Sequence, residues 1–332
     1  MKRIGKAFAR ASLAAAALGL LAAGASAQQA SSPLTVATTS GSVHIMPLPG
    51  DTNAMRALAA DPGPLLYHTG GVIMQPSVTI YPIFWIPSKL QTGGATGVTA
   101  KYPSVQIKML NDYVGHTLGS NDTQYNQTSP TAYFLNKGGI GGFYVDSTAY
   151  PASGCTDTAT PGACLSDAQI QAEISNVMTI KGWTGGIGKI FMLFTSSGEG
   201  SCASATSTQC AYTFYCAYHS VFGTVANPII YSNEPYGNTS VCQLPGTPSP
   251  NGDAIADTAA TAASHELTEA ITDPELNAWY TSLGNEIGDL CAYNYGTNTW
   301  DGGLANQSWS ADFFELQTEF DNHTSSCVQV GP

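Results

Sequence analysis

Residues 265–274 have the sequence HELTEAITDP, which places one imidazole and two carboxylates within five positions of a chain that is only 10% charged. His265 and Glu269 are four residues apart. On a helix they lie on one face at about 6 Å, a spacing that suits two ligands of one small metal ion. Glu266 points about 100° around the helix, where it could take a proton from a metal-bound water as the general base. The segment therefore predicts a helix that carries a metal site.

A second acidic cluster, NEIGD, follows at residues 285–289. A catalytic zinc site needs three protein ligands and an open position for water. We expect His265 and Glu269 to supply two ligands, and Glu286 or Asp289 to supply the third. Asp289 is equally suited to orienting a ligand from outside the coordination sphere. The predicted reaction is metal-assisted hydrolysis of an amide or a related bond, which makes a peptide or protein the expected substrate.

Other interpretations of these residues stay open. The helix face could be a solvated acidic surface without an ion, and a carboxylate pair such as Glu266 with Glu286 is also typical of glycosidases. The chain has no Gly-x-Ser-x-Gly motif, which argues against a serine hydrolase with a nucleophile elbow.

Among the other histidines, His219 is expected to be a hydrogen-bonded structural residue. His44 is expected to be exposed to solvent.

The N-terminal region predicts export. Four lysines and arginines precede an apolar run at residues 11–23, and Ala-Ser-Ala at residues 25–27 is a small-residue cleavage site. Residues 1–27 therefore resemble a secretory signal peptide more than a membrane anchor, which needs a longer apolar run. Residues 28–62 are rich in small and polar residues and predict a flexible leader or pro-segment. Residues 63–332 then form one secreted domain, extracellular or periplasmic.

All eight cysteines lie after residue 150. An even number of cysteines in an exported chain predicts disulfide bonds, and the cysteine spacings do not match a zinc finger or ribbon. Eight cysteines allow about 105 pairings, of which we expect the sequential one because short loops are the easiest to close. The expected bonds are Cys155–Cys164, Cys202–Cys210, Cys216–Cys242 and Cys291–Cys327.

The net charge of −12 does not identify a partner, although it argues against a polyanionic one. Basic residues are clustered only at the extreme N-terminus, so nucleic acid is not an expected partner. No later segment is long and apolar enough to cross a bilayer, so a membrane is not expected either. We expect a monomer.

Apolar runs and helical stripes along the chain predict an α+β domain with a mixed sheet, a site-bearing helix and a loop-rich, disulfide-bonded C-terminal part. Pro82 places the first strand at an edge or a bulge. Pro274 ends the site helix near Thr272, and residues 313–320 fit either a strand or a short helix. The expected strands are residues 78–86, 190–195 and 228–231, and the expected helices are residues 103–114, 166–181 and 253–272.

The two acidic motifs together resemble the site of the thermolysin-like zinc peptidases, the gluzincins. The resemblance implies a zincin-like fold in which His265 is the first zinc ligand, Glu266 the base and Glu286 the downstream ligand. It implies that Asp289 orients a ligand. This chain departs from the family at Glu269, where the family has a histidine, and in the shorter distance to the downstream glutamate. The extra carboxylate makes the site more anionic, so Mn²⁺, Mg²⁺ or Ca²⁺ stay open beside Zn²⁺.

A second resemblance extends over more residues. The motifs HEL at residues 265–267, NAWY at 277–280, EIGDLC at 286–291 and CAYH at 216–219 are similar to those of the phosphate-induced, EXORDIUM-like secreted proteins. The resemblance implies an extracellular, disulfide-bonded protein, and the plant members are associated with growth signalling and the cell wall. No firm enzyme activity comes with that family. It therefore implies a second hypothesis, a non-catalytic binding or signalling protein whose acidic site holds a structural ion or none.

Overall fold

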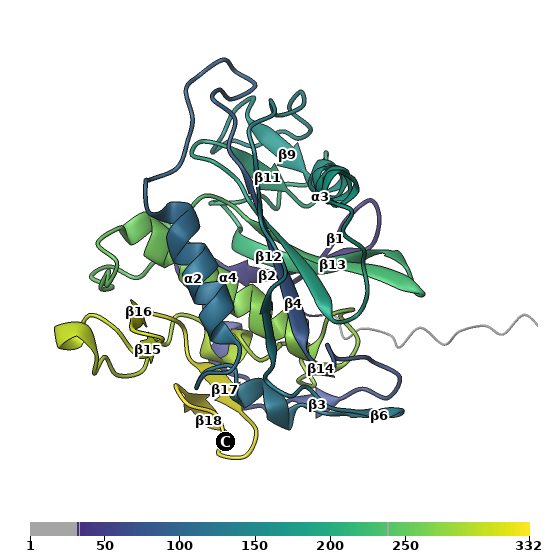
Figure 1. The fold of residues 1–332 in the computed structure, drawn as a ribbon, viewed down its shortest axis with the longest axis vertical. Helices are drawn as coiled ribbons and strands as arrows, with labels where there is room; N and C mark the ends of the chain where they lie inside the picture. The colour runs from purple at the N-terminus through teal and green to yellow at the C-terminus, as the bar shows by residue number, and fades with distance from the viewer. Residues whose placement is uncertain (1–31, 33, 238) are drawn as a thin grey trace, which may run out of the picture.

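The structure, a computed structural model, describes residues 32, 34–237 and 239–332 of the chain. The predicted signal peptide, residues 1–27, lies outside the described residues. Within the described part, the chain forms a mixed eight-stranded sheet and four α-helices (Figure 1). It also contains four disulfide bonds. The predicted α+β class with a mixed sheet is confirmed.

The large sheet has the strand order β1-β2-β12-β13-β10-β4-β7, and β8 also pairs with β4. The strands β13, β10, β4, β7 and β8 run parallel to one another, whereas the pairs β1–β2, β2–β12 and β12–β13 are antiparallel. The three predicted strands, β4, β10 and β13, are neighbours in its centre. The bounds are β1 Thr35–Ala37, β2 Ser42–Pro47, β4 Val78–Trp85, β7 Gly138–Ile140, β8 Tyr144–Asp146, β10 Lys189–Phe194, β12 Tyr215–Thr224 and β13 Asn227–Glu234.

The remaining strands form two-stranded sheets around this core. They are β3 Leu66–Tyr67 with β14 Trp279–Tyr280, β5 Gln127–Thr128 with β6 Thr131–Ala132, β9 Cys164–Ser166 with β11 Gly200–Cys202, β15 Gln307–Trp309 with β16 Asp312–Phe314, and β17 Glu319–Asp321 with β18 Ser326–Val328. Three short 3₁₀ helices are η1 Asn121–Gln124, η2 Asp289–Cys291 and η3 Asp301–Gly303. Residues 313–320 thus contain strand residues, not a helix.

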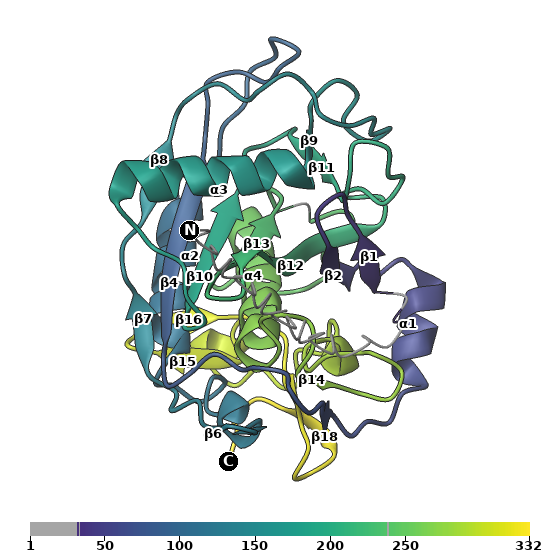
Figure 2. The ribbon, with the colours of Figure 1, turned by 90° about the vertical axis from the view of Figure 1, so that its right-hand side faces the viewer.

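The helices cover both faces of the large sheet. Helices α2 (Tyr102–Tyr113) and α4 (Ala254–Thr272) lie on one face, and α3 (Asp167–Lys181) lies on the other (Figure 2). Helix α1 (Thr52–Ala59) packs beside η2. Because side chains alternate between the faces of a strand, β10 buries apolar residues on both sides. This double burial explains its uninterrupted apolar sequence.

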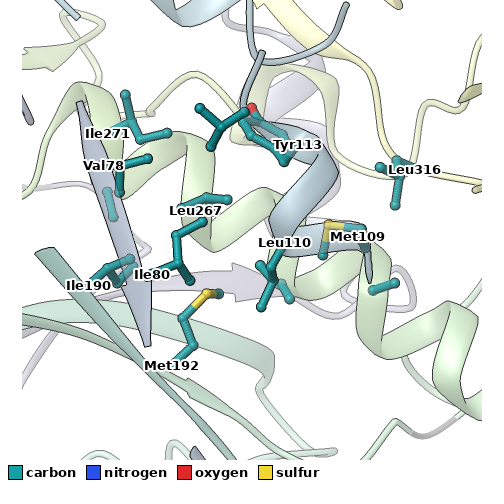
Figure 3. Packing of buried hydrophobic residues seen from close by; sticks show 14 of the residues in the cluster. Val78, Ile80, Met109, Leu110, Tyr113, Ile190, Met192, Leu267, Ile271 and Leu316 are labelled. Atoms are coloured by element: carbon teal, nitrogen blue, oxygen red, sulfur yellow. The ribbon is translucent and has the colours of Figure 1, made fainter. Parts of the chain in front are cut away.

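Helix α4 is the most deeply enclosed helix of the domain. It starts after Asp253, whose carboxylate accepts a hydrogen bond from the backbone of Ala256, and it ends before Pro274, as predicted. Its apolar side chains pack against the strands and α2, where Leu267 and Ile271 face β4 and β10 (Figure 3). Every residue of α4 from position 256 to 272 is buried. Charged residues on this helix are therefore buried as well.

Two expectations are corrected. The leader is not flexible over residues 35–59, because these form β1, β2 and α1, and β2 pairs with β12 in the large sheet. Cleavage of a pro-segment stays a prediction. Strand β4 does not lie at an edge, because β10 pairs with one side of it. Its other side pairs with β7 up to Ile80 and with β8 from Ile83. Pro82, which has no N–H to donate, falls in the gap between these two partners.

The four disulfide bonds are the predicted ones: Cys155–Cys164, Cys202–Cys210, Cys216–Cys242 and Cys291–Cys327. Such bonds are typical of proteins in oxidising compartments. Among the helices that the structure describes, none has the length and apolar character to span a membrane.

Leu267→Ala is expected to lower the free energy of unfolding by about 3 kcal/mol, because a buried leucine on α4 is replaced by a cavity. Ile180→Ala on α3 is the matched control. Its side chain is 54% exposed, so we expect a change within about 0.5 kcal/mol. Urea unfolding monitored by circular dichroism measures both, and equal changes would contradict the assigned packing of α4.

Replacing both Cys291 and Cys327 by alanine is expected to lower the free energy of unfolding by about 4 kcal/mol, because that bond closes the longest loop and most restricts the unfolded chain. Removing the bond between Cys202 and Cys210, only eight residues apart, is expected to cost about 2.5 kcal/mol. Denaturant unfolding of the two double variants tests the ranking. A larger loss for the short loop would contradict it.

Candidate metal centre

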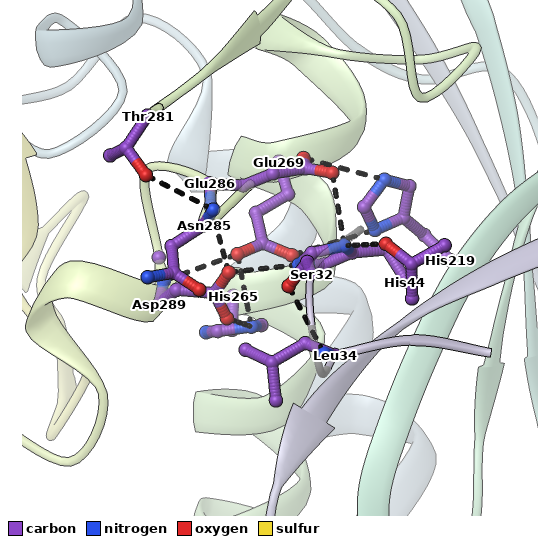
Figure 4. Close-up of polar contacts among 12 residues, drawn as sticks. Ser32, Leu34, His44, His219, His265, Glu269, Thr281, Asn285, Glu286 and Asp289 are labelled. Carbon is purple, nitrogen blue, oxygen red and sulfur yellow. Dashed lines mark hydrogen bonds and ion pairs between the residues drawn. The ribbon is translucent and has the colours of Figure 1, made fainter. Parts of the chain in front are cut away.

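Seven buried side chains converge beside the C-terminal half of α4, and we call them the ligand cluster. None is more than 2% exposed. Figure 4 shows the labelled members pointing toward one another. The ligand cluster consists of His44, His219, His265, Glu266, Glu269, Glu286 and Asp289.

The α4 residues and the 285–289 loop come together as the sequence predicted. The backbone N–H of Asp289 donates to Oε1 of Glu269 at 3.2 Å, and the N–H of Glu286 donates to Oδ2 of Asp289 at 2.7 Å. Gly288 permits this close approach. A Cβ at Gly288 would lie 2.6 Å from Nδ1 of His265 and 3.0 Å from Oε1 of Glu269.

Two histidines of the large sheet complete the cluster, and the sequence analysis missed both. His44 on β2 and His219 on β12 are directly paired across the antiparallel strands, with ring centroids 5.8 Å apart. Neighbouring residues Val43 and Tyr218 pack on the opposite, α3-covered face of the sheet. Strand alternation therefore turns both rings toward α4. The prediction that His44 is exposed is wrong, since it is fully buried.

His44 lies between two carboxylates. Its Nε2 is 2.8 Å from Oδ2 of Asp289, and its Nδ1 is 3.3 Å from Oε1 of Glu286. Burial by itself lowers the pKa of His44, but the charge of Asp289 and the hydrogen bond to it outweigh this and raise the pKa to about 9. In the absence of a bound metal ion, an imidazolium at this position supplies positive charge to the cluster.

His219 contacts the other end of the cluster. Its Nδ1 lies 3.1 Å from Oε2 of Glu266 and 3.5 Å from Oε2 of Glu269. Its Nε2 lies 3.7 Å from Oε2 of Glu286. Burial, followed by the charges of His44 and His265, holds the pKa of His219 well below its usual value. His219 is therefore a neutral imidazole, the form that binds metals.

His265 is held by an amide. Nε2 of Gln317 lies 3.1 Å from Nδ1 of His265, and the same amide donates to Gly288 O at 2.7 Å. The amide oxygen accepts from the backbone of Tyr293. Because an amide nitrogen can only donate, Nδ1 of His265 is the acceptor and the ring proton lies on Nε2. That nitrogen is 3.2 Å from Oε1 of Glu269 but is not in hydrogen-bond geometry, so the contact between His265 and Glu269 is electrostatic.

The cluster contains many polar atoms that have no hydrogen-bond partner. Such atoms are rare in folded proteins and indicate a missing partner. Of the lysines and arginines that the structure describes, only Lys108 forms an ion pair, with Asp312 outside the cluster. The buried unpartnered atoms are Nε2 of His219 and His265, one oxygen each of Glu266, Glu269 and Glu286, and Oδ1 of Asp289.

The buried carboxyl groups show the same deficit of positive charge. Burial raises the pKa of Glu266 well above its usual value, and the charges of Glu269 and Glu234 add to this. Burial, followed by the charges of Asp273 and Glu269, does the same for Glu286. A divalent cation bound among these groups would supply the missing charge and the missing contacts.

Two sets of donor atoms are close enough to bind a metal ion. One set is His44, Glu269 and Asp289, and the other is His219, Glu266 and Glu269. Within each set, the ligand atoms lie within 4.8 Å of one another. Glu269 belongs to both.

All five predicted site residues are in the cluster, and their individual roles stay predictions. His265 lies beside Glu269 and 4.0 Å from Oδ1 of Asp289. Glu286 contacts His44 and His219, two residues that the sequence analysis had not assigned to the site. The signal that could have found these histidines is a single imidazole within an otherwise apolar strand.

Comparisons with protein family models, with curated proteins and with solved structures found no match for this chain.

Metal-free protein is expected to lose stability as the pH rises from 6.5 to 9. The folded-state pKa of His44 is raised from 6.5 to about 9, so its stabilisation is fully present below pH 6.5 and is lost as pH rises through 9. The contribution of His44 to this loss in the free energy of unfolding is about 3 kcal/mol. Glu266 and Glu286 add to the loss, because their raised pKa values also give the folded state more bound protons.

Urea unfolding of chelator-treated protein at pH 6.5 and pH 9 measures this loss. His44→Gln should remove the part that belongs to His44, and His116→Gln, outside the cluster, is the matched control for the loss of one histidine. A free energy of unfolding that is constant or rises over this range would contradict the assignment.

Proposed function

We propose that this protein is a secreted, zincin-like metal-dependent hydrolase that acts on peptide or protein substrates. The observation that carries the proposal is the set of buried, unpartnered histidine and carboxylate atoms around α4 and residues 285–289. Structural cores do not bury four carboxylates without compensation. The four disulfide bonds support export.

The donor types suit a first-row divalent ion. Imidazole nitrogen combined with carboxylate oxygen is a ligand set of Zn²⁺. The high share of carboxylates leaves Mn²⁺, Mg²⁺ and Ca²⁺ as alternatives. When bound, such an ion lowers the pKa of a coordinated water toward neutrality.

Glu266 is the proposed general base. Its Oε2 lies 3.1 Å from Nδ1 of His219, and its Oε1 has no hydrogen-bond partner. Burial raises the pKa of Glu266, which makes its carboxylate a stronger proton acceptor than a glutamate in water. Oε1 would take the proton of the attacking water, while His265 keeps Glu269 oriented.

A second candidate function is a closed, non-catalytic metal centre in an EXORDIUM-like binding or signalling protein. The observation that favours it is the burial of the whole cluster, because structural metal sites are closed and catalytic sites keep a position open. The residues that line five surface cavities of the described chain include no member of the ligand cluster. Under this candidate, the ion stabilises the fold.

Glu266→Gln is expected to lower the rate of hydrolysis of an unfolded protein substrate by about 100-fold or more, because it removes the general base. The metal content should not fall by more than a small fraction. Asp312→Asn, a carboxylate outside the cluster, is the matched control and should keep full activity. Plasma emission spectrometry and a protease assay on the same preparations measure both quantities.

Equal hydrolysis by wild-type protein and Glu266→Gln would contradict the hydrolase. If a chelator lowers the melting temperature while no hydrolysis is found before or after metal is restored, the closed centre is the correct candidate. Absence of any bound or bindable divalent ion would exclude both.

A further inference from the structure

The two donor sets meet at one carboxylate. Glu269 belongs to the set with His44 and Asp289 and to the set with His219 and Glu266. Its two oxygens have different surroundings. Oε1 receives the N–H of Asp289 at 3.2 Å, whereas Oε2 lies 3.5 Å from Nδ1 of His219 and has no hydrogen-bond partner. A carboxylate placed in this way can ligate a different ion with each oxygen.

Glu286 also lies close to both histidines, with one carboxylate oxygen near each. Its Oε1 is 3.3 Å from Nδ1 of His44, and its Oε2 is 3.7 Å from Nε2 of His219. The ring centroids of the two histidines are 5.8 Å apart. Because the two rings project side by side from paired strands, each can bind one of two cations about 3.5–4 Å apart, the usual separation in two-metal sites.

The charge balance also favours two ions. The cluster holds four carboxylates, Glu266, Glu269, Glu286 and Asp289, all buried. One divalent cation would neutralise two of them, and the other two would then have to bind protons or remain as buried negative charges, which are costly in a protein interior. Two divalent cations would neutralise all four. None of the described lysines and arginines forms an ion pair with the cluster. The one ion pair that they form joins Lys108 to Asp312 at the surface.

We propose that the ligand cluster is a dinuclear centre, in which two divalent cations share Glu269 as a bridging carboxylate. The first ion takes His44 and Asp289, and the second takes His219, with Glu266 beside it as the general base of the proposed function. Glu286 lies between the two ions as a second bridging carboxylate. His265 is a positioning residue that orients Glu269. This inference rests on the proposed metal binding and adds the number of ions and their division among the ligands.

The test uses the full secreted chain, stripped with a chelator and reloaded with Mn²⁺ or Zn²⁺ alone. Two equivalents of Zn²⁺ per chain are expected by plasma emission spectrometry. Electron paramagnetic resonance of the Mn²⁺-loaded protein should show a spin-coupled pair, with hyperfine lines closer together than those of an isolated ion. These measurements need no variant, so they do not depend on whether a substitution folds.

Variants then test the division of ligands. His44→Ala and His219→Ala should each bind one equivalent and give the signal of an isolated Mn²⁺ ion. Glu269→Gln should lose the coupled signal, and His116→Ala should keep two equivalents. Circular dichroism checks that each variant is folded.

Three outcomes would contradict the dinuclear centre or the assigned ligand sets. One equivalent of Zn²⁺ with isolated Mn²⁺ signals in the wild-type protein would overturn the dinuclear centre and leave the proposed metal-dependent function standing. No binding at all would overturn both. Retention of two coupled ions in His44→Ala or His219→Ala would overturn the assigned ligand sets.

Discussion

The constraint on which this structure depends is the burial of negative charge without lysine or arginine. Glu266 and Glu269 lie on a helix that is enclosed on all sides, and the 285–289 loop adds two further carboxylates at the same place. Coulomb repulsion among such groups is strong in a low-dielectric interior. Imidazole rings and bound protons reduce it in the metal-free state, and divalent cations can remove it. The same buried negative charge therefore limits the stability of the metal-free fold and favours the binding of divalent cations.

Each part of the fold contributes to the position of that centre. The large sheet pairs His44 with His219 and turns both toward α4. The apolar side of α4 packs on the sheet and so fixes the position of Glu269 relative to the two histidines. The bond from Cys291 to Cys327 ties η2, which begins at Asp289, to the C-terminal hairpin. Ligands from four distant segments thus meet at atoms only a few ångströms apart, which is the preorganisation that a metal site requires.

Much of this could be predicted from the sequence because the signals are local. The spacing of His265 and Glu269, the helix stop at Pro274 and the sequential disulfide pairing depend on neighbouring residues or short loops. The roles of His44 and His219 could not be predicted in this way, because they depend on the register between β2 and β12, strands far apart in sequence. The small and polar composition of residues 28–62 did not predict β1, β2 and α1. The strand β2 is stabilised by its pairing with β12 and not by the propensity of its residues.

The central claim is that a cation binds between α4, the 285–289 loop and the two sheet histidines. The most direct measurement is an anomalous difference map from a crystal of metal-loaded protein, recorded at the absorption edge of the added ion. The account predicts anomalous density between the Glu269 carboxylate and the rings of His44 and His219. A map with no peak there, at full loading and with the side chains ordered, would contradict it.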